Sequence, residues 1–146
     1  MDEFKTFIAL SYLLTGISDL NPTKSASPLI DRMARDYLHC LKEQFGADFI
    51  ALLTLYDGKS ASSDPLASLV NDPAFKDQIE SMAKQVVHSW LLSQIRIETF
   101  DASNKKGDSA PAVDVGFFEK GYIWPAIKAH PIGFSHQSHG YWAHKP

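Results

Sequence analysis

Histidine is the residue type in this sequence with the clearest potential for metal chemistry, and four of the six histidines lie near the C-terminus. They are His130, His136, His139 and His144, and the spacing His136-x-x-His139 could direct two imidazoles toward one ion. A zinc site requires three or four ligands at a definite spacing on a fixed backbone. The sequence has one cysteine, Cys40, and no His-Glu-x-x-His pattern to complete such a set. The four histidines are therefore weak metal candidates, and hydrogen bonding to backbone or to a partner is the alternative role.

Sequence patterns typical of catalytic sites or of nucleotide binding are absent. Serine precedes histidine at 135–136 and at 138–139, but a Ser-His-Asp triad is defined by a three-dimensional geometry that neighbours in sequence do not supply. There is no Gly-x-Ser-x-Gly elbow and no Gly-x-Gly-x-x-Gly loop. Carboxylates fall on the polar sides of predicted helices, at Asp31, Asp36, Glu43 and Asp48. We therefore expect a protein that is not an enzyme and that holds no cofactor of its own.

The C-terminal segment 121–146 combines aromatic residues with helix-breaking ones. Trp124, Phe134, Tyr141 and Trp142 are separated by glycines and prolines, which oppose both a long helix and a regular strand. Disordered segments are typically poor in aromatic residues. The sequence therefore predicts an irregular aromatic tail that packs either on this chain's own helices or on a partner.

The rest of the chain is predicted to be helical. Cap residues and apolar periodicity predict a helix from Asp2 to Thr15 ended by Gly16, and a second from the Ser27-Pro28 pair to Gly46. Further helices are expected from Asp48 to about 56, from Asp72-Pro73 to about 90 as the longest one, and from 114 to 122, with a short extended piece at 95–97. Asp64-Pro65, like Asp72-Pro73, pairs a cap residue with a proline suited to a first helical position.

These elements predict an all-α fold of four to five helices with an irregular, Gly/Pro-rich aromatic C-terminal tail. We expect one domain over 1–146, with a helical core at 1–100, a flexible loop at 101–110, and a short helix and extended tail at 111–146. The first helix and the one after Pro73 carry more than one apolar stripe, and this surplus predicts a partner surface.

Charge and hydropathy argue against nucleic-acid binding, a transmembrane helix and a signal peptide. The net charge of −3 and a pI near 6.0 give no basic stripe for nucleic acid. The longest apolar stretch, at 7–17, is shorter than the roughly 18 residues of a transmembrane helix. Its flank, Met1–Lys5, is acidic, which favours a folded amphipathic helix over a signal peptide.

Several stretches, taken in order, resemble one family. The chain opens with Phe-Ile-Ala-Leu-Ser-Tyr-Leu-Leu-Thr-Gly at 7–16, followed by Leu20, and Asp72-Pro73 leads toward Trp90. It ends with Trp-Pro-Ala-Ile-Lys-Ala-His-Pro-Ile-Gly at 124–133 and Gly-Tyr-Trp-Ala-His-Lys-Pro at 140–146. The sequence resembles the small (gamma) subunit family of bacterial membrane-bound FAD-dependent sugar and polyol dehydrogenases over almost its full length.

The resemblance implies a non-catalytic accessory subunit that binds, stabilises and helps to mature or export the FAD-containing catalytic subunit, with a cytochrome c subunit as a further partner. FAD would belong to the partner, and any membrane association would pass through the complex. The family is periplasmic; a chain without its twin-arginine signal is otherwise expected in the cytoplasm. An independent His-cluster metal-binding domain and a helical module for an unrelated partner are the alternatives.

The residues expected at the partner interface come from two sources. Those that match the family motifs are Leu14, Thr15, Gly16, Trp90, Gly140, Tyr141, Trp142 and Pro146. Trp124 and Phe134 are included because they belong to the aromatic tail.

Overall fold

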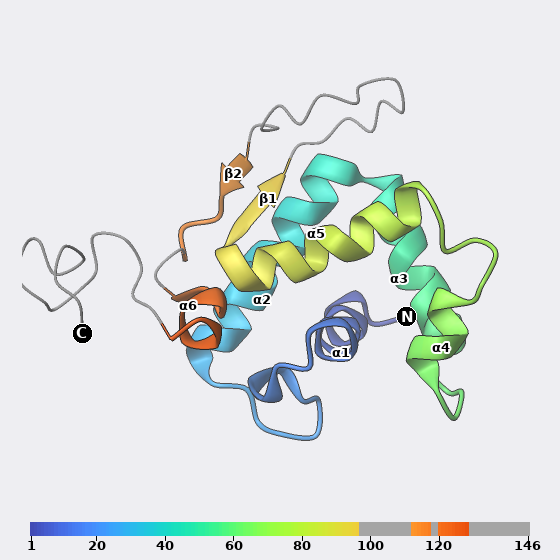
Figure 1. Cartoon of the computed structure of the whole chain (residues 1–146), viewed down its shortest axis with the longest axis horizontal. Coiled ribbons are helices and arrows are strands. Elements are labelled where there is room, and N and C mark those ends of the chain that lie inside the picture. Colours follow the sequence, from blue (N-terminus) through green and yellow to red (C-terminus); the bar gives the residue numbers. More distant parts are fainter. Residues whose placement is uncertain (97–111, 118–119, 129–146) are drawn as a thin grey trace, which may run out of the picture.

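The computed structural model describes residues 1–96, 112–117 and 120–128, and these form a mainly helical structure (Figure 1). The predicted all-α class is confirmed. The described elements are α1 (Glu3–Thr15), the 3₁₀ turn η1 (Ser18–Leu20), α2 (Pro28–Phe45), α3 (Ala47–Lys59), α4 (Pro65–Val70), α5 (Gln78–Leu92), β1 (Gln94–Arg96), β2 (Ala112–Asp114) and α6 (Ile123–Ala126). The predicted loop at 101–110 lies outside the described residues.

The first two helices begin and end where their cap residues predict. The Asp2 carboxylate accepts a hydrogen bond from the Lys5 backbone N–H at 3.2 Å, and Gly16 ends α1 in the left-handed conformation with φ of 66°. The Ser27 hydroxyl caps α2 by accepting from the Ile30 N–H at 3.3 Å. These caps use groups within three or four residues of each other, so they are readable from sequence.

Two helix starts differ from the prediction. Gly46, and not Asp48, is the N-cap of α3, and this helix continues past Gly58 to Lys59. The Asp72-Pro73 pair does not begin a helix, because α5 starts at Gln78. At 18 residues, α2 is the longest described helix, while α5 has 15.

Asp72 has a different role from the predicted helix cap. Its carboxylate accepts a hydrogen bond from the Ala74 N–H at 2.8 Å, which closes a local turn. The same carboxylate pairs with the Lys59 ammonium at the end of α3, with N and O 2.8 Å apart. This side-chain turn, followed by Asp77 with φ of 49°, replaces the first turn of the expected helix.

The segment after α5 is extended, as predicted, and pairs with a later strand. β1 and β2 are antiparallel, with Ile95 opposite Val113. The helix expected at 114–122 is not formed as predicted, because Asp114 belongs to β2 and α6 begins only at Ile123. Ser93 directs the pairing: its carbonyl accepts from the Val115 N–H at 2.9 Å and its hydroxyl accepts from the Phe117 N–H at 3.0 Å.

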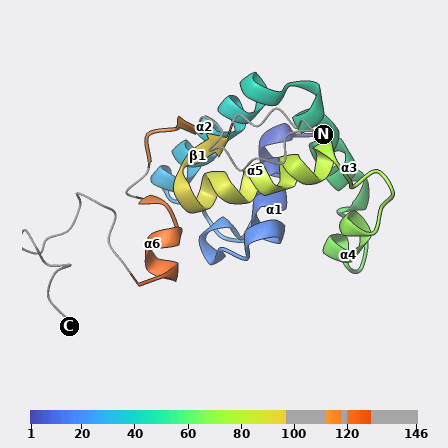
Figure 2. The same ribbon diagram turned by 45° about the horizontal axis from the view of Figure 1, so that its top comes forward.

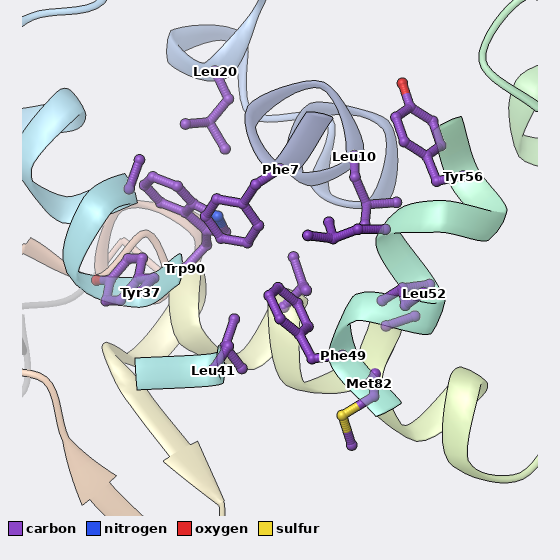
Figure 3. Packing of buried hydrophobic residues seen from close by; sticks show 14 of the residues in the cluster. Phe7, Leu10, Leu20, Tyr37, Leu41, Phe49, Leu52, Tyr56, Met82 and Trp90 are labelled. Carbon is purple, nitrogen blue, oxygen red and sulfur yellow. The ribbon is translucent and has the colours of Figure 1, made fainter. Parts of the chain in front are cut away.

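Aromatic residues from four helices meet in the core (Figure 3). The Phe7 ring of α1 lies between Phe49 of α3, with centroids 6.1 Å apart, and Trp90 of α5, at 6.5 Å. Tyr37 of α2 meets Trp90 edge-on at 4.9 Å. All four side chains are fully buried, so the helices share one hydrophobic core around Trp90.

Candidate functional site

An open apolar groove runs along the outer side of α5. It has a volume of about 400 Å³ and is bordered by Leu14 from the end of α1. The rest of its apolar lining consists of Phe75, which precedes α5, and of three α5 residues, Ala83, Val87 and Leu91. We name this surface the α5 groove. A volume of this size falls within the range of small-molecule pockets.

The α5 groove exists because α5 has two apolar stripes. Met82, Val86 and Trp90 recur every four residues and lie in the core. Ala83, Val87 and Leu91 follow each of them by one position, and they form the second stripe that lines the groove. Val87 and Leu91 are half-buried, so the second stripe is only partly covered by the described residues. The predicted surplus of apolar surface on this helix is therefore confirmed.

Charged residues lie at the edge of the groove. Glu80 and Lys84 line the groove and form an ion pair with N and O 3.0 Å apart. His88 also lines it, and its Nδ1 lies 2.9 Å from the Gln94 carbonyl oxygen. A neutral or protonated Nδ1–H can donate to that oxygen, which ties α5 to β1. Glu80 and Lys84 thus pair with each other and His88 contacts β1, while the other lining residues of the groove are apolar.

A second groove, the α1 groove, lies between α1, η1 and the start of α2. Phe4, Ile8, Leu20 and Ile30 line its apolar part, and its volume is about 370 Å³. Phe4 is further covered by the Arg35 guanidinium, which lies 4.2 Å from the ring centroid. A third depression, the α3 face, lies between α3, the turn before α5 and the first turn of α5, and it is lined by Ala47, Ile50, Ala51, Thr54, Leu55, Ala74 and Ile79. The described residues therefore carry apolar surface depressions on at least three sides of different helices: beside α5, beside α1 and beside α3.

The motif at the end of α1 contributes to the α5 groove through one residue. Leu14 is half-buried and lines the groove. Thr15 instead holds the turn: its hydroxyl donates to the Ser11 carbonyl at 2.7 Å and accepts from the Ile17 N–H at 3.2 Å. Gly16 supplies the left-handed residue, and its N–H donates to the Tyr12 carbonyl. Thr15 and Gly16 therefore set the position of Leu14 and the path of the chain behind it.

Trp90 was expected at the partner interface, but it lies in the core. Its side chain has no exposed surface and is enclosed by the rings of Phe7, Tyr37 and Tyr122. A residue enclosed in this way cannot contact a partner directly. Periodicity placed Trp90 on the apolar face of its helix, but only the packing of four elements shows that this face is the core.

Trp124 lies on α6, which is fastened to the end of α5. The Tyr122 N–H donates to the Trp90 carbonyl at 3.1 Å, and the Tyr122 hydroxyl donates to the Asp19 carboxylate at 2.9 Å. Burial, followed by the hydrogen bond to Asp19, raises the pKa of the Tyr122 hydroxyl, which keeps the hydroxyl protonated as a donor. Trp124 itself is half-buried. Figures 1 and 2 both show α6 beside the C-terminal end of α5.

The remaining predicted site residues lie outside the described residues. They are Phe134, Gly140, Tyr141, Trp142 and Pro146 of the expected interface, and His130, His136, His139 and His144 of the metal alternative.

Two further observations concern metal binding and thiol chemistry among the described residues. Among 1–96, 112–117 and 120–128 there is no group of three or more His, Cys, Asp or Glu side chains placed to hold a metal ion. Burial, with Glu43 and Asp36 nearby, raises the pKa of the Cys40 thiol, so the thiolate that would act as a nucleophile is disfavoured. No helix among the described residues is long and apolar enough to cross a membrane.

Sequence reasoning missed most of the groove. Val87 and Leu91 were not singled out, although their spacing of four residues was a readable signal. The hydrogen bond between Tyr122 and Asp19 joins residues 103 positions apart and leaves no local signal.

Comparisons of this chain with protein-family models, with curated proteins and with solved structures give no match.

Proposed function

We propose that this chain is a non-catalytic accessory subunit that binds and stabilises the FAD-containing catalytic subunit of a sugar or alcohol dehydrogenase. Under this proposal the flavoprotein carries the chemistry, and a cytochrome c subunit accepts the electrons. The chain supplies apolar surface that holds the flavoprotein in a soluble, FAD-loaded form, and it accompanies the complex to the periplasm.

The α5 groove is the observation that carries the proposal. A second apolar stripe on a helix is costly to leave in water, since each buried Å² of apolar surface is worth roughly 25 cal/mol. Exposed apolar patches of this kind mark interaction sites in soluble proteins. Leu14, which belongs to the motif that resembles the accessory-subunit family, lines this groove. The interface would therefore combine Leu14, the second stripe of α5 and the aromatic tail.

Co-expression tests the proposed function directly. The first step is to establish whether a gene for an FAD-dependent sugar or alcohol dehydrogenase lies beside the gene of this chain. That flavoprotein is then produced with and without this chain, and soluble flavoprotein is measured by its flavin absorbance. We expect a large gain in soluble, FAD-loaded flavoprotein and co-purification of the two chains. Equal amounts of FAD-loaded flavoprotein in both cases would refute the proposed function.

Two matched variants locate the contact. Val87→Asp places a carboxylate in the α5 groove, whereas Leu55→Asp places one on the α3 face, at another half-buried apolar position that lines a surface depression. We expect Val87→Asp to reduce co-purification of the flavoprotein and Leu55→Asp to leave it near the wild-type level. The opposite order would move the interface to the α3 face.

A further inference from the structure

We propose that the α1 groove binds a small zwitterion with an apolar body, of the chemical class of the apolar α-amino acids. The ligand's ammonium pairs with the Asp19 carboxylate and its carboxylate pairs with the Lys24 ammonium, while its side chain lies on the apolar floor of the groove. The proposal concerns the chain alone and does not depend on the proposed function, whose interface includes the α5 groove.

The floor of the α1 groove is apolar and is built by three elements. Leu20 of η1 and Ile30 of α2 are buried there, and Phe4 and Ile8 of α1 are half-buried beside them. The volume of about 370 Å³ lies near the lower end of the range for small-molecule pockets, which is roughly 300–1,000 Å³. The groove therefore suits a small ligand with one apolar side chain.

Asp19 lines this groove with a carboxylate that no cation among the described residues neutralises. Its Oδ2 accepts the hydrogen bond from the Tyr122 hydroxyl at 2.9 Å, whereas its Oδ1 has no hydrogen-bond partner among the described residues. The Tyr122 donor is a neutral hydroxyl, so this bond orients the carboxylate and leaves its negative charge in place. Asp19 is exposed, and a ligand ammonium can therefore reach it from solvent.

Lys24 supplies the opposite charge in the same groove. It lines the groove from the loop between η1 and α2 and is exposed. In the part of the chain that the structure describes, its ammonium forms no ion pair, either with Asp19 or with another carboxylate. The other two charged residues of the lining, Lys5 and Asp31, each have an ion-pair partner three or four positions away.

The two uncompensated charges decide which class of ligand fits. An anion placed on the apolar floor would satisfy Lys24 but would lie beside the unpaired carboxylate of Asp19, and a cation would meet the reverse situation. A zwitterion satisfies both charges at once, and complementary charges of this kind select against partners that carry only one of them. An apolar side chain on the same molecule accounts for the floor.

The other two depressions lack this combination. In the α5 groove, Glu80 and Lys84 already pair with each other. The α3 face is lined by no charged side chain. Of the three depressions, the α1 groove alone offers an unpaired carboxylate and an unpaired ammonium above an apolar floor.

Three probes that share one phenyl group test the proposal on the full chain. L-phenylalanine carries both charges, hydrocinnamate lacks the ammonium, and phenethylamine lacks the carboxylate. Isothermal titration calorimetry at neutral pH and low salt gives the affinities, and amide chemical shifts in NMR spectra locate the site. We expect L-phenylalanine to bind about tenfold more tightly than either singly charged probe and to shift the amide signals of Ile8, Leu20 and Ile30.

Two variants assign the charges, and a third is the control. Asp19→Asn keeps an acceptor for the Tyr122 hydroxyl and should abolish the preference for L-phenylalanine over hydrocinnamate. Lys24→Met should abolish the preference over phenethylamine, and Lys84→Met in the α5 groove should leave both preferences unchanged. Far-UV circular dichroism shows that each variant is folded.

Three results would overturn the proposal. They are equal affinity for the three probes, which means apolar contact only; preferences that survive in both Asp19→Asn and Lys24→Met; and no saturable binding of L-phenylalanine, or binding with shifts confined to the α5 groove or the α3 face. Because the titrations contain no flavoprotein, each of these results leaves the proposed function standing.

Discussion

Replacement of Trp90 tests whether this residue stabilises the core or contacts a partner. The side chain is fully buried at the point where α1, α2, α5 and the segment before α6 meet. An aromatic side chain of this kind buries about 150–250 Å², which corresponds to about 4–6 kcal/mol at roughly 25 cal/mol per Å². We therefore expect Trp90→Ala to lower the free energy of unfolding by about 3–5 kcal/mol. This is a large part of a typical total of about 5–15 kcal/mol.

Trp90→Phe separates packing from hydrogen bonding. The indole Nε1 is buried and has no hydrogen-bond partner among the described residues. An unsatisfied buried donor costs about 1–3 kcal/mol, so its removal offsets much of the lost packing. We expect Trp90→Phe to cost less than about 2 kcal/mol, well below the cost of Trp90→Ala.

Urea unfolding followed by far-UV circular dichroism measures both variants. The half-buried Trp124 provides the control, and Trp124→Ala should cost less than Trp90→Ala. A loss below about 1 kcal/mol for Trp90→Ala would refute the placement of this residue in the core. If Trp90→Phe keeps its stability but loses the flavoprotein, Trp90 contacts the partner and does not act through the core alone.

Four further predictions concern the tail, the metal alternative, a turn and an ion pair. Trp142→Ala should weaken flavoprotein binding in a pull-down more than it lowers the melting temperature, and the reverse result would mean that the tail is part of the core. Purified protein should contain no stoichiometric zinc, copper or iron by elemental analysis, and one equivalent of any of them would revive the metal role of the four C-terminal histidines. Gly16→Ala should cost about 1–2 kcal/mol in urea unfolding, because φ is 66° there while no atom lies within 4 Å of the added Cβ. The hydrogen bonds from Lys59 and from the Ala74 N–H lower the pKa of the Asp72 carboxyl, so ionised Asp72 stabilises the fold above its ordinary value of 3.8. Asp72→Asn should therefore destabilise the protein at neutral pH in urea unfolding, and its deficit should shrink as the pH falls below 3.8; a constant deficit would contradict this role.

The limits of several helices could be predicted because their signals are local. Asp2, Ser27 and Asp64 each cap a helix by accepting a hydrogen bond from an N–H three residues later. The same local signal failed at Asp72, where the carboxylate closes a turn and pairs with Lys59. An aspartate before a proline suits either arrangement, and a lysine 13 positions away decides between them.

The surplus of apolar surface on α5 was predicted, but the part of it that stays partly uncovered was not. The surplus of apolar residues on α5 is a property of the sequence, since spacing alone puts 82, 86 and 90 on one stripe and 83, 87 and 91 on the next. Which stripe becomes core depends on the elements that pack against the helix. Trp90 was expected at an interface and lies in the core, whereas Leu14 was expected there and lines the groove.

The sequence by itself determined the helical class, the principal caps and the presence of more apolar surface than one helical core requires. Only the tertiary structure decided which of that surface is left partly uncovered. Phe7, Tyr37 and Tyr122 enclose Trp90 from three separate parts of the chain, and Tyr122 reaches Asp19 across 103 positions. Contacts over such separations depend on the closure of the whole chain and leave no periodic trace in the residues that make them.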